Sequence, residues 1–134
     1  MDKLYTFTVK TPQTTAMIDI TDKVQEVVRE SNVKDGICII FIPHTTAAVT
    51  INENADPDVV HDFLMEMNKV IPFSDGYRHM EGNSAAHIKS SLMGFSETII
   101  IKDSRLRLGT WQGIYLTEFD GPRVRKVHAK IIEG

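Results

Sequence analysis

The run Gly36-Ile37-Cys38-Ile39-Ile40-Phe41-Ile42 decides the fold of this chain. It is continuously apolar and rich in β-branched isoleucine, a pattern typical of a central strand that is covered on both faces. Pro43 ends the run, because proline has no N–H to donate to a sheet. The chain is therefore built around a β-sheet, and the segments on either side must supply its neighbouring strands and its covering layers.

Strand patterns recur on both sides of this run. Tyr5, Phe7 and Val9 alternate with threonines, which predicts a strand with one buried face. Further strands are expected at residues 16–20, 47–51, 97–102, 106–108, 113–119 and 124–132. Strands therefore dominate the chain.

Three segments predict helices. The first is expected to run from Thr21, a typical N-cap residue, to a stop by residues 34–36. The second begins at Asp56-Pro57, where a capping aspartate precedes a proline at the first helical position, and it ends before Pro72.

The third helix is expected to begin at Asn83 or Ser84 and to end at Gly94, with Ile88 and Leu92 facing inward. The predicted fold class is α+β, with a largely antiparallel sheet or sandwich and about three helices.

Composition limits the classes of function. The chain has 134 residues, of which 42% are hydrophobic and 25% charged, as expected for a single globular domain over residues 1–134. Its net charge of −3 gives no basic excess for nucleic-acid phosphates, and no apolar stretch approaches the roughly 20 residues of a membrane span. Cys38 is the single cysteine, so no internal disulfide can form. The N-terminus lacks an apolar signal region, and we predict a cytoplasmic protein.

The first group of candidate site residues follows the central strand. His44, Thr45 and Thr46 lie just past its end, where a rigid scaffold presents side chains to a ligand, and the two hydroxyls can bind an anion. A turn histidine bonded to the backbone explains His44 equally well. Glu53 lies shortly before the second helix and is less easily explained than its neighbours by capping or turn formation.

The densest polar cluster is residues 77–83, followed by His87 in the third helix. His79 and Glu81 are two residues apart, so an extended strand would point both side chains the same way. Histidines are the commonest metal ligands, and a carboxylate beside them suits a catalytic divalent metal. The spacing is no fixed metal motif, and the histidines alone leave a metal site and a site without metal equally open.

The third candidate segment is residues 109–123. Gly109-Thr110-Trp111-Gln112-Gly113 places the single tryptophan between glycines, which permit close approach of a ligand or a second chain. Glu118 lies on an apolar face of the following strand, and a carboxylate there needs a partner. Arg123 can bind phosphate bidentately, although a hairpin turn with a solvated arginine is the open alternative.

Taken together, these segments resemble the YjbQ family, also called the secondary thiamine-phosphate synthase family. The matching stretches are His44 to Ala47, Asn52 to Val59, His79 to His87, Leu92 to Gly94, Gly109 to Ile114 and Glu118 to Arg123. Gly-Thr-Trp-Gln is the most specific of them. In one departure, Ser104 stands where the family tends to carry glycine, in a predicted turn.

The resemblance implies a compact α+β fold that assembles as a homotrimer, with pockets near the histidines. It also implies a weak thiamine-phosphate synthase activity, which joins hydroxymethylpyrimidine diphosphate to thiazole phosphate and releases pyrophosphate. A divalent metal, zinc or magnesium, and cationic donors would stabilise the leaving charge, and no organic cofactor is expected.

On this hypothesis, roles follow for the candidate residues. The catalytic residues are His44, Glu53, Glu81 and Gln112; the substrate-binding residues are Thr45, Thr46, Arg78, Asn83 and Arg123; and the metal ligands are His44, His79 and His87. The partner would be a small phosphorylated molecule or anion. Two alternatives stay open: a metal-dependent hydrolase of a phosphorylated or amide substrate with Glu81 as base, and a non-catalytic trimeric protein that binds an anion or small ligand.

Overall fold

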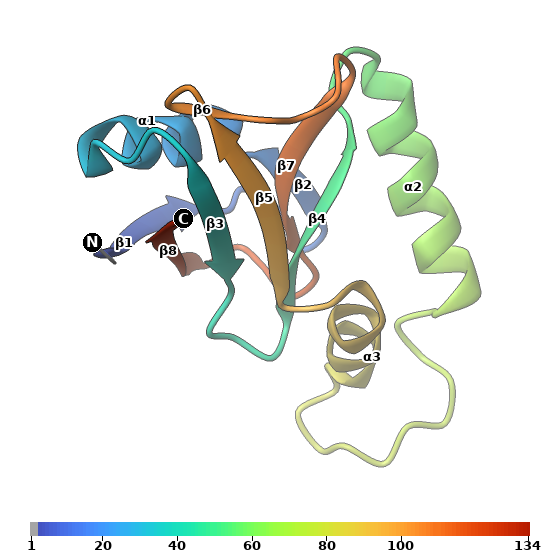
Figure 1. Cartoon of the computed structure of the whole chain (residues 1–134). Helices are drawn as coiled ribbons and strands as arrows, with labels where there is room; N and C mark the ends of the chain where they lie inside the picture. The colour runs from blue at the N-terminus through green and yellow to red at the C-terminus, as the bar shows by residue number, and fades with distance from the viewer. Residues whose placement is uncertain (1–2) are drawn as a thin grey trace.

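The computed structural model describes residues 3–134, which form eight strands and three helices. In chain order these are β1 (Lys3–Lys10), β2 (Ala16–Asp19), α1 (Thr21–Ser31), β3 (Gly36–Phe41), β4 (Ala47–Glu53), α2 (Pro57–Val70), α3 (Ser84–Met93), β5 (Ser96–Lys102), β6 (Arg105–Leu106), β7 (Gln112–Glu118) and β8 (Val124–Glu133). The strands lie in two sheets, with helices at the ends and on one side (Figure 1). The prediction of an antiparallel α+β fold with three helices is confirmed.

The larger sheet contains five strands in the order β1-β8-β3-β5-β6, and every neighbouring pair in it is antiparallel. The predicted central strand, β3, lies between β8 and β5. Its alternate residues Cys38 and Ile40 point into the molecule and are fully buried. The apolar run therefore does form the middle of the sheet.

The smaller sheet has the order β2-β7-β4 and is also antiparallel. The core lies between the two sheets, where Ile40 and Ile131 of the larger sheet belong to one buried cluster with Val49 and Leu116 of the smaller. Helix α1 closes one end of this core with Val24, Val27 and Val28.

The other two helices lie against the smaller sheet. Helix α3 packs on β4, whereas α2 stands along the outside of the sheet and has no fully buried residue (Figure 1). The predicted start of α2 is confirmed, since the Asp56 carboxylate accepts a hydrogen bond of 2.9 Å from the Asp58 N–H. Lys89 of α3 is fully buried and donates to Asn68 of α2 at 2.6 Å, which ties the two helices together.

Three local predictions are wrong. Thr21 is the first helical residue rather than the cap, and Asp19 accepts from its N–H and its hydroxyl instead. Ile88 and Leu92 are 40% and 70% exposed, because α3 buries small residues and Lys89 against the sheet.

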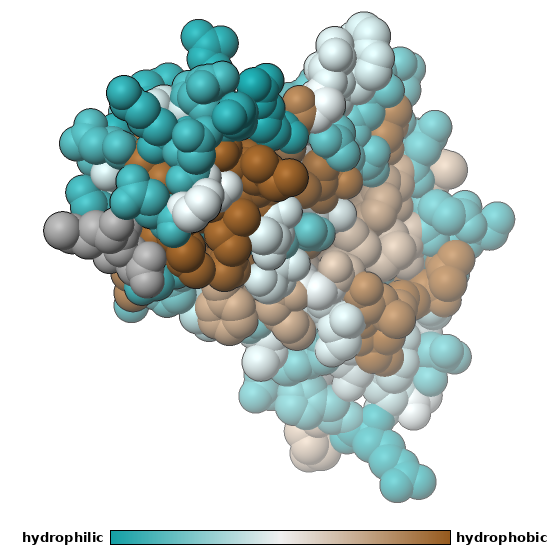
Figure 2. Space-filling view, in the orientation of Figure 1, coloured by the Kyte–Doolittle hydropathy of each residue, from teal (hydrophilic) through white to brown (hydrophobic). Residues whose placement is uncertain are grey.

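The third correction concerns β3, which the sequence predicted to be covered on both faces. Only its inner face is covered within one chain. On the outer face Ile37 lies between Ile100 and Ile132, and Phe41 is 46% exposed. Figure 2 shows this apolar patch over β3 and β5.

The predicted turn before β6 is present. Asp103 and Ser104 both adopt left-handed backbone conformations, with φ of 53° and 65°. Ser104 is held in that conformation by hydrogen bonds from its N–H to Lys34 and from Gln25 to its carbonyl. A side chain is thus accommodated where glycine would be easier.

No helix within residues 3–134 is long and apolar enough to cross a membrane.

Candidate functional site

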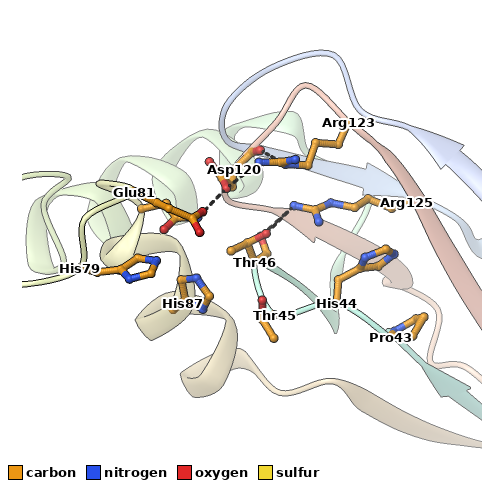
Figure 3. Close-up of a pocket in the computed structure, with 11 residues that line it drawn as sticks. Pro43, His44, Thr45, Thr46, His79, Glu81, His87, Asp120, Arg123 and Arg125 are labelled. Atoms are coloured by element: carbon orange, nitrogen blue, oxygen red, sulfur yellow. Dashed lines mark hydrogen bonds and ion pairs between the residues drawn. The ribbon is translucent and has the colours of Figure 1, made fainter.

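A cavity that gathers many of the predicted site residues lies where the two sheets meet, at the exit of β3 and the start of α3. Its volume is about 460 Å³. The lining residues are Pro43, His44, Thr45, Thr46, His79, Glu81, Asn83, His87, Asp120, Arg123 and Arg125 (Figure 3). We call this cavity the polar pocket. It brings together residues that lie up to 82 positions apart in the chain.

A buried ion pair forms the floor of the polar pocket. Glu118 of β7 is fully buried and Arg125 of β8 is 4% exposed. The Arg125 guanidinium donates to both carboxylate oxygens of Glu118, one of them at 2.8 Å, and Thr11 donates to Glu118 at 2.7 Å. Because β7 and β8 belong to different sheets, this pair joins the two layers. The predicted need of Glu118 for a partner is confirmed.

Hydrogen bonds outweigh burial in setting the ionisation of Glu118. Burial alone would raise the pKa of this carboxyl. The Arg125 guanidinium, the Asp120 N–H and the Thr11 hydroxyl all bond to the charged form, and together they hold the pKa below its ordinary value. The floor is therefore a charged pair at neutral pH.

The floor also orients Thr46. Arg125 Nη2 donates to the Thr46 hydroxyl oxygen at 2.8 Å and lies 3.3 Å from its carbonyl oxygen. A hydroxyl has one hydrogen to donate and lone pairs to accept with. Since the hydroxyl oxygen of Thr46 already accepts from the arginine, its hydrogen is left to donate to a ligand in the polar pocket.

His44 is held in one tautomer by the backbone of β8. Its Nε2 accepts a hydrogen bond of 2.8 Å from the Lys126 N–H. Lys126 lies just beyond the last residue of β8 that pairs with β3, which is His128. An amide N–H can only donate, so Nε2 must be unprotonated and the neutral ring carries its hydrogen on Nδ1. Burial and the nearby Arg125 lower the pKa of His44, which keeps the ring neutral. His44 therefore presents an Nδ1–H donor.

Asp120 organises the upper wall. Its Oδ2 accepts from Asn83 Nδ2 at 3.0 Å and pairs with Arg123 Nη2 at 3.1 Å. The Asp120 carbonyl also accepts from Arg123 Nε at 2.8 Å. The turn behind them needs glycine at position 121, because a Cβ there would lie 2.1 Å from the Gln13 carbonyl oxygen. This turn fixes the guanidinium of Arg123 at the rim.

His79 and His87 form a pair on the opposite side of the polar pocket from His44, with Thr45 and Thr46 between (Figure 3). Their ring centroids are 5.4 Å apart in an edge-to-face arrangement. Glu81 also lines this side, so two imidazoles and one carboxylate face the same space.

These residues do not form a ready metal site. Within residues 3–134, no three His, Cys, Asp or Glu side chains are grouped closely enough to hold an ion. The Nε2 of His44, its unprotonated nitrogen, is already bonded to Lys126. The predicted trio His44, His79 and His87 therefore does not fit a bound metal in this conformation.

Three predicted site residues lie outside the polar pocket. Glu53 and Gln112 pair with each other at the far end of β4 and β7, whereas the polar pocket lies beside the opposite end of these strands. Strand β4 has seven residues, so its two ends are six steps apart, or roughly 20 Å at about 3.4 Å per step. Gln112 instead accepts from the Gly109 N–H, which closes the Gly-Thr-Trp-Gln turn. Arg78 is exposed and does not line the cavity.

Sequence reasoning missed Asp120 and Arg125. The missing partner of Glu118 was a signal for a buried cation, but the pattern of β8 gave no reason to prefer Arg125 over the other basic residues of that strand. Asp120 lies in the segment for which the sequence offered a hairpin turn, and its bond to Asn83 joins residues 37 positions apart.

The family model described as UPF0047 protein YjbQ-like matches residues 5–134. The chain belongs to the YjbQ family. A UPF0047 protein of Methanocaldococcus jannaschii, MJ1081, is 54% identical over 96% of this chain and 94% of its own length. YugU of Bacillus subtilis is 50% identical over 96% and 98%.

Solved structures extend this YjbQ-family assignment to the fold. A YjbQ/UPF0047 protein from Clostridium acetobutylicum has a TM-score of 0.94 at 58% identity, covering 96% of this chain and 99% of that one. A protein of Sulfolobus solfataricus, described as YbjQ-like and of unknown function, has a TM-score of 0.94 at 32% identity over the full length of both chains. The fold predicted from the family resemblance is therefore confirmed.

Proposed function

We propose that the polar pocket binds the phosphate or diphosphate group of a small molecule. The observation that carries this proposal is the convergence of donors on one cavity: the His44 Nδ1–H, the Thr46 hydroxyl and the Arg123 guanidinium. An anion accepts from such groups, and a guanidinium matches the geometry of phosphate oxygens. The first turn of α3, with Asn83 and His87, adds the positive end of a helix dipole.

We further propose that the reaction is a slow synthesis of the thiamine-phosphate type. A ring nitrogen of thiazole phosphate attacks the CH₂ of hydroxymethylpyrimidine diphosphate and forms a C–N bond. The C–O bond breaks, and pyrophosphate leaves with the electron pair. Arg123, Thr46 and His44 would stabilise the charge that develops on the leaving group. The family resemblance supports the choice of this reaction.

The exposure of a donor supports a low rate. No step of the proposal passes through a metal ion, because no three His, Cys, Asp or Glu side chains of the described residues are grouped closely enough to hold one. Arg123 is 53% exposed, and donors in contact with water stabilise charge less than enclosed donors. A bound zinc or magnesium ion stays a prediction of the sequence, as does a cytoplasmic location.

The test is to incubate the purified protein with both substrates and measure thiamine phosphate and pyrophosphate in equal amounts. Replacing Arg123 by Gln should lower turnover about tenfold or more, by removing one charged donor. Replacing Arg107 by Gln is the matched control, since Arg107 is similarly exposed and far from the polar pocket. Unchanged turnover in Arg123→Gln would contradict the proposal.

A second candidate function is a metal-dependent hydrolase, because His79, His87 and Glu81 line one wall of the polar pocket. These three side chains would have to move closer together than they lie in this structure to hold an ion. Glu81 would take a proton from water as that water attacks the phosphorus or carbonyl carbon. This alternative predicts release of phosphate or pyrophosphate without thiazole phosphate, and loss of that release on chelation. Binding of inorganic phosphate with no turnover of either kind would instead support the non-catalytic anion-binding alternative.

We also propose that the chain assembles as a homotrimer. The outer face of the larger sheet supports this, because Ile37, Ile100 and Ile132 lie side by side there and Ile100 is 62% exposed. Contiguous exposed apolar side chains of this kind are typical of interfaces between chains.

A further inference from the structure

A second cavity lies directly behind the wall of the polar pocket. Its volume is about 160 Å³, and it shares Asn83 and Asp120 with the polar pocket. The remaining lining residues are Thr14, Phe73, Gly82, Ala85, Ala86 and Phe119. We call it the side cavity. Its wall combines two aromatic rings and two alanine methyl groups with polar groups, whereas the polar pocket has no aromatic side chain other than histidine.

The wall between the two cavities carries an unused acceptor. Asn83 donates through Nδ2 to Asp120, but its Oδ1 is buried and accepts no hydrogen bond within the described chain. Because an ionised carboxylate can only accept, the Asn83 atom bonded to Asp120 must be the amide nitrogen, and the unpaired atom must be the amide oxygen. Buried acceptors are nearly always paired, so an unpaired one beside a cavity calls for a donor from a ligand.

The aromatic wall of the side cavity is held in place from behind. The ammonium of Lys89 lies 4.5 Å from the centroid of the Phe73 ring and 5.9 Å from that of Phe119. Phe119 is buried, whereas Phe73 is 49% exposed. The buried cation therefore helps to hold the exposed Phe73 ring over the cavity. A wall fixed before binding costs a ligand less ordering.

The size of the side cavity selects a small ring. An apolar cavity of about 150 Å³ in another protein accommodates benzene. Asn83 and Asp120 line both cavities. A chemical group bound in the side cavity is therefore separated from a group bound in the polar pocket by only the width of a side chain. One ligand with a short linker can therefore occupy both.

We propose that the side cavity binds a small planar ring that carries an N–H or O–H donor for Asn83 Oδ1, while the phosphate of the same molecule occupies the polar pocket. This inference rests on the proposed function only for the phosphate. It assigns the specificity of the site to Phe73, Phe119 and Asn83, and it holds whether the bound molecule is transformed or only retained.

The test compares three probes by calorimetric titration: inorganic phosphate, benzyl phosphate and aminobenzyl phosphate. The ring should tighten binding about tenfold or more relative to inorganic phosphate, because its carbon atoms leave water for contact with the rings of Phe73 and Phe119. The amino group should tighten it further by pairing with Asn83.

Thr14→Phe separates the two cavities experimentally. Thr14 is exposed at the rim, so a larger side chain there fills the side cavity without disturbing the core. This variant should bind benzyl phosphate no better than inorganic phosphate and leave inorganic phosphate binding unchanged. The matched control is Gln13→Phe, which adds the same bulk at the neighbouring exposed position outside the cavity and should retain the preference for the ring.

The possible outcomes are distinct. If inorganic phosphate binds and the ring adds nothing, this inference is wrong and the proposed anion site stands. If a ring preference is present but survives in Thr14→Phe, the ring lies elsewhere and the inference is also wrong. If none of the three probes binds, both proposals fail. Loss of the ring preference in Thr14→Phe alone supports the side cavity.

Discussion

At the scale of single residues, the pair formed by Glu118 and Arg125 supports both the fold and the polar pocket. The two groups are almost inaccessible to water, and each satisfies the charge of the other. The sequence predicted half of this arrangement, because a carboxylate on an apolar strand face must have a partner. The identity of the partner depends on which strand of the other sheet crosses at that point, which no local pattern contains.

Removing one member of this pair should be costly. We expect Arg125→Met to lower the free energy of unfolding by about 3–5 kcal/mol, because it leaves the Glu118 carboxylate buried without its cation. The control is Lys102→Met, which breaks a pair with Asp35 whose two side chains are each 55% exposed, and which should cost less than about 1 kcal/mol. Urea denaturation of the three proteins measures both values. Equal losses would contradict our account of the floor.

The same pair should make stability depend on pH in the acid range. The pKa of Glu118 lies below its ordinary value of 4.5, so the unfolded chain takes up a proton first as the pH falls. The contribution of Glu118 is complete above about pH 4.5 and is lost as the pH falls through that value towards the lower folded pKa. Denaturation at a series of pH values should therefore give a steeper acid loss for the natural protein than for Glu118→Gln. Parallel curves would show that the bonds to Glu118 do not favour its charged form.

His44 gives a prediction about hydrogen position. At neutral pH its Nε2 should be unprotonated and its Nδ1 protonated, because Nε2 accepts from the Lys126 N–H. Nitrogen chemical shifts of the imidazole ring, correlated with its carbon-bound protons by NMR, distinguish the two tautomers. His61, which is 72% exposed, is the internal reference for a solvated ring. A hydrogen on Nε2 of His44 would rule out its proposed role as an Nδ1 donor.

At the scale of elements, the existence and order of the helices and strands could be predicted far better than the faces they bury. The capping aspartate and proline located the start of α2, and β-branched runs located β3 and β5. Helix α3 was misjudged because its apolar residues Ile88 and Leu92 suggested a conventional core face. Its buried face instead carries alanines, a serine and Lys89, since α3 packs closely on β4 and beside the polar pocket.

The different burial of α1 and α2 should be visible in matched substitutions. Val28 of α1 is fully buried in the core, so Val28→Ala should lower the free energy of unfolding by about 2 kcal/mol. Val60 of α2 lies on a face with no fully buried residue, and Val60→Ala should cost at most about 1 kcal/mol. Both values come from urea denaturation. A larger loss at Val60 would mean that α2 is covered in solution by something other than this chain.

At the scale of the whole molecule, the candidate residues divide between two ends. The histidines, Thr46 and Arg123 converge on the polar pocket, whereas Glu53, Gln112 and Trp111 lie at the other end of the smaller sheet. The sequence joined all of them into one site, because their clustering along the chain gave no measure of distance across it. The register of β4 with β7 shows that the two groups of residues lie at opposite ends of these strands.

The outer face of the larger sheet gives a prediction about assembly. If the homotrimer forms through this face, light scattering should give a mass three times the 15.1 kDa of the chain. Ile100, which is 62% exposed on this face, should then be essential, and Ile100→Lys should reduce the mass to that of a monomer. Met80→Lys is the control, because Met80 is 98% exposed in the loop before α3. A trimer that persists in Ile100→Lys would assign the interface to another surface.

Trp111 is the single tryptophan of the chain, and it is 64% exposed in the turn at the far end of the smaller sheet. Its fluorescence in the folded protein should already be that of an indole in water. Unfolding would then change the emission little, and a melting curve recorded this way would miss the main transition. A shift of the emission to shorter wavelength would instead report that another molecule has covered this turn.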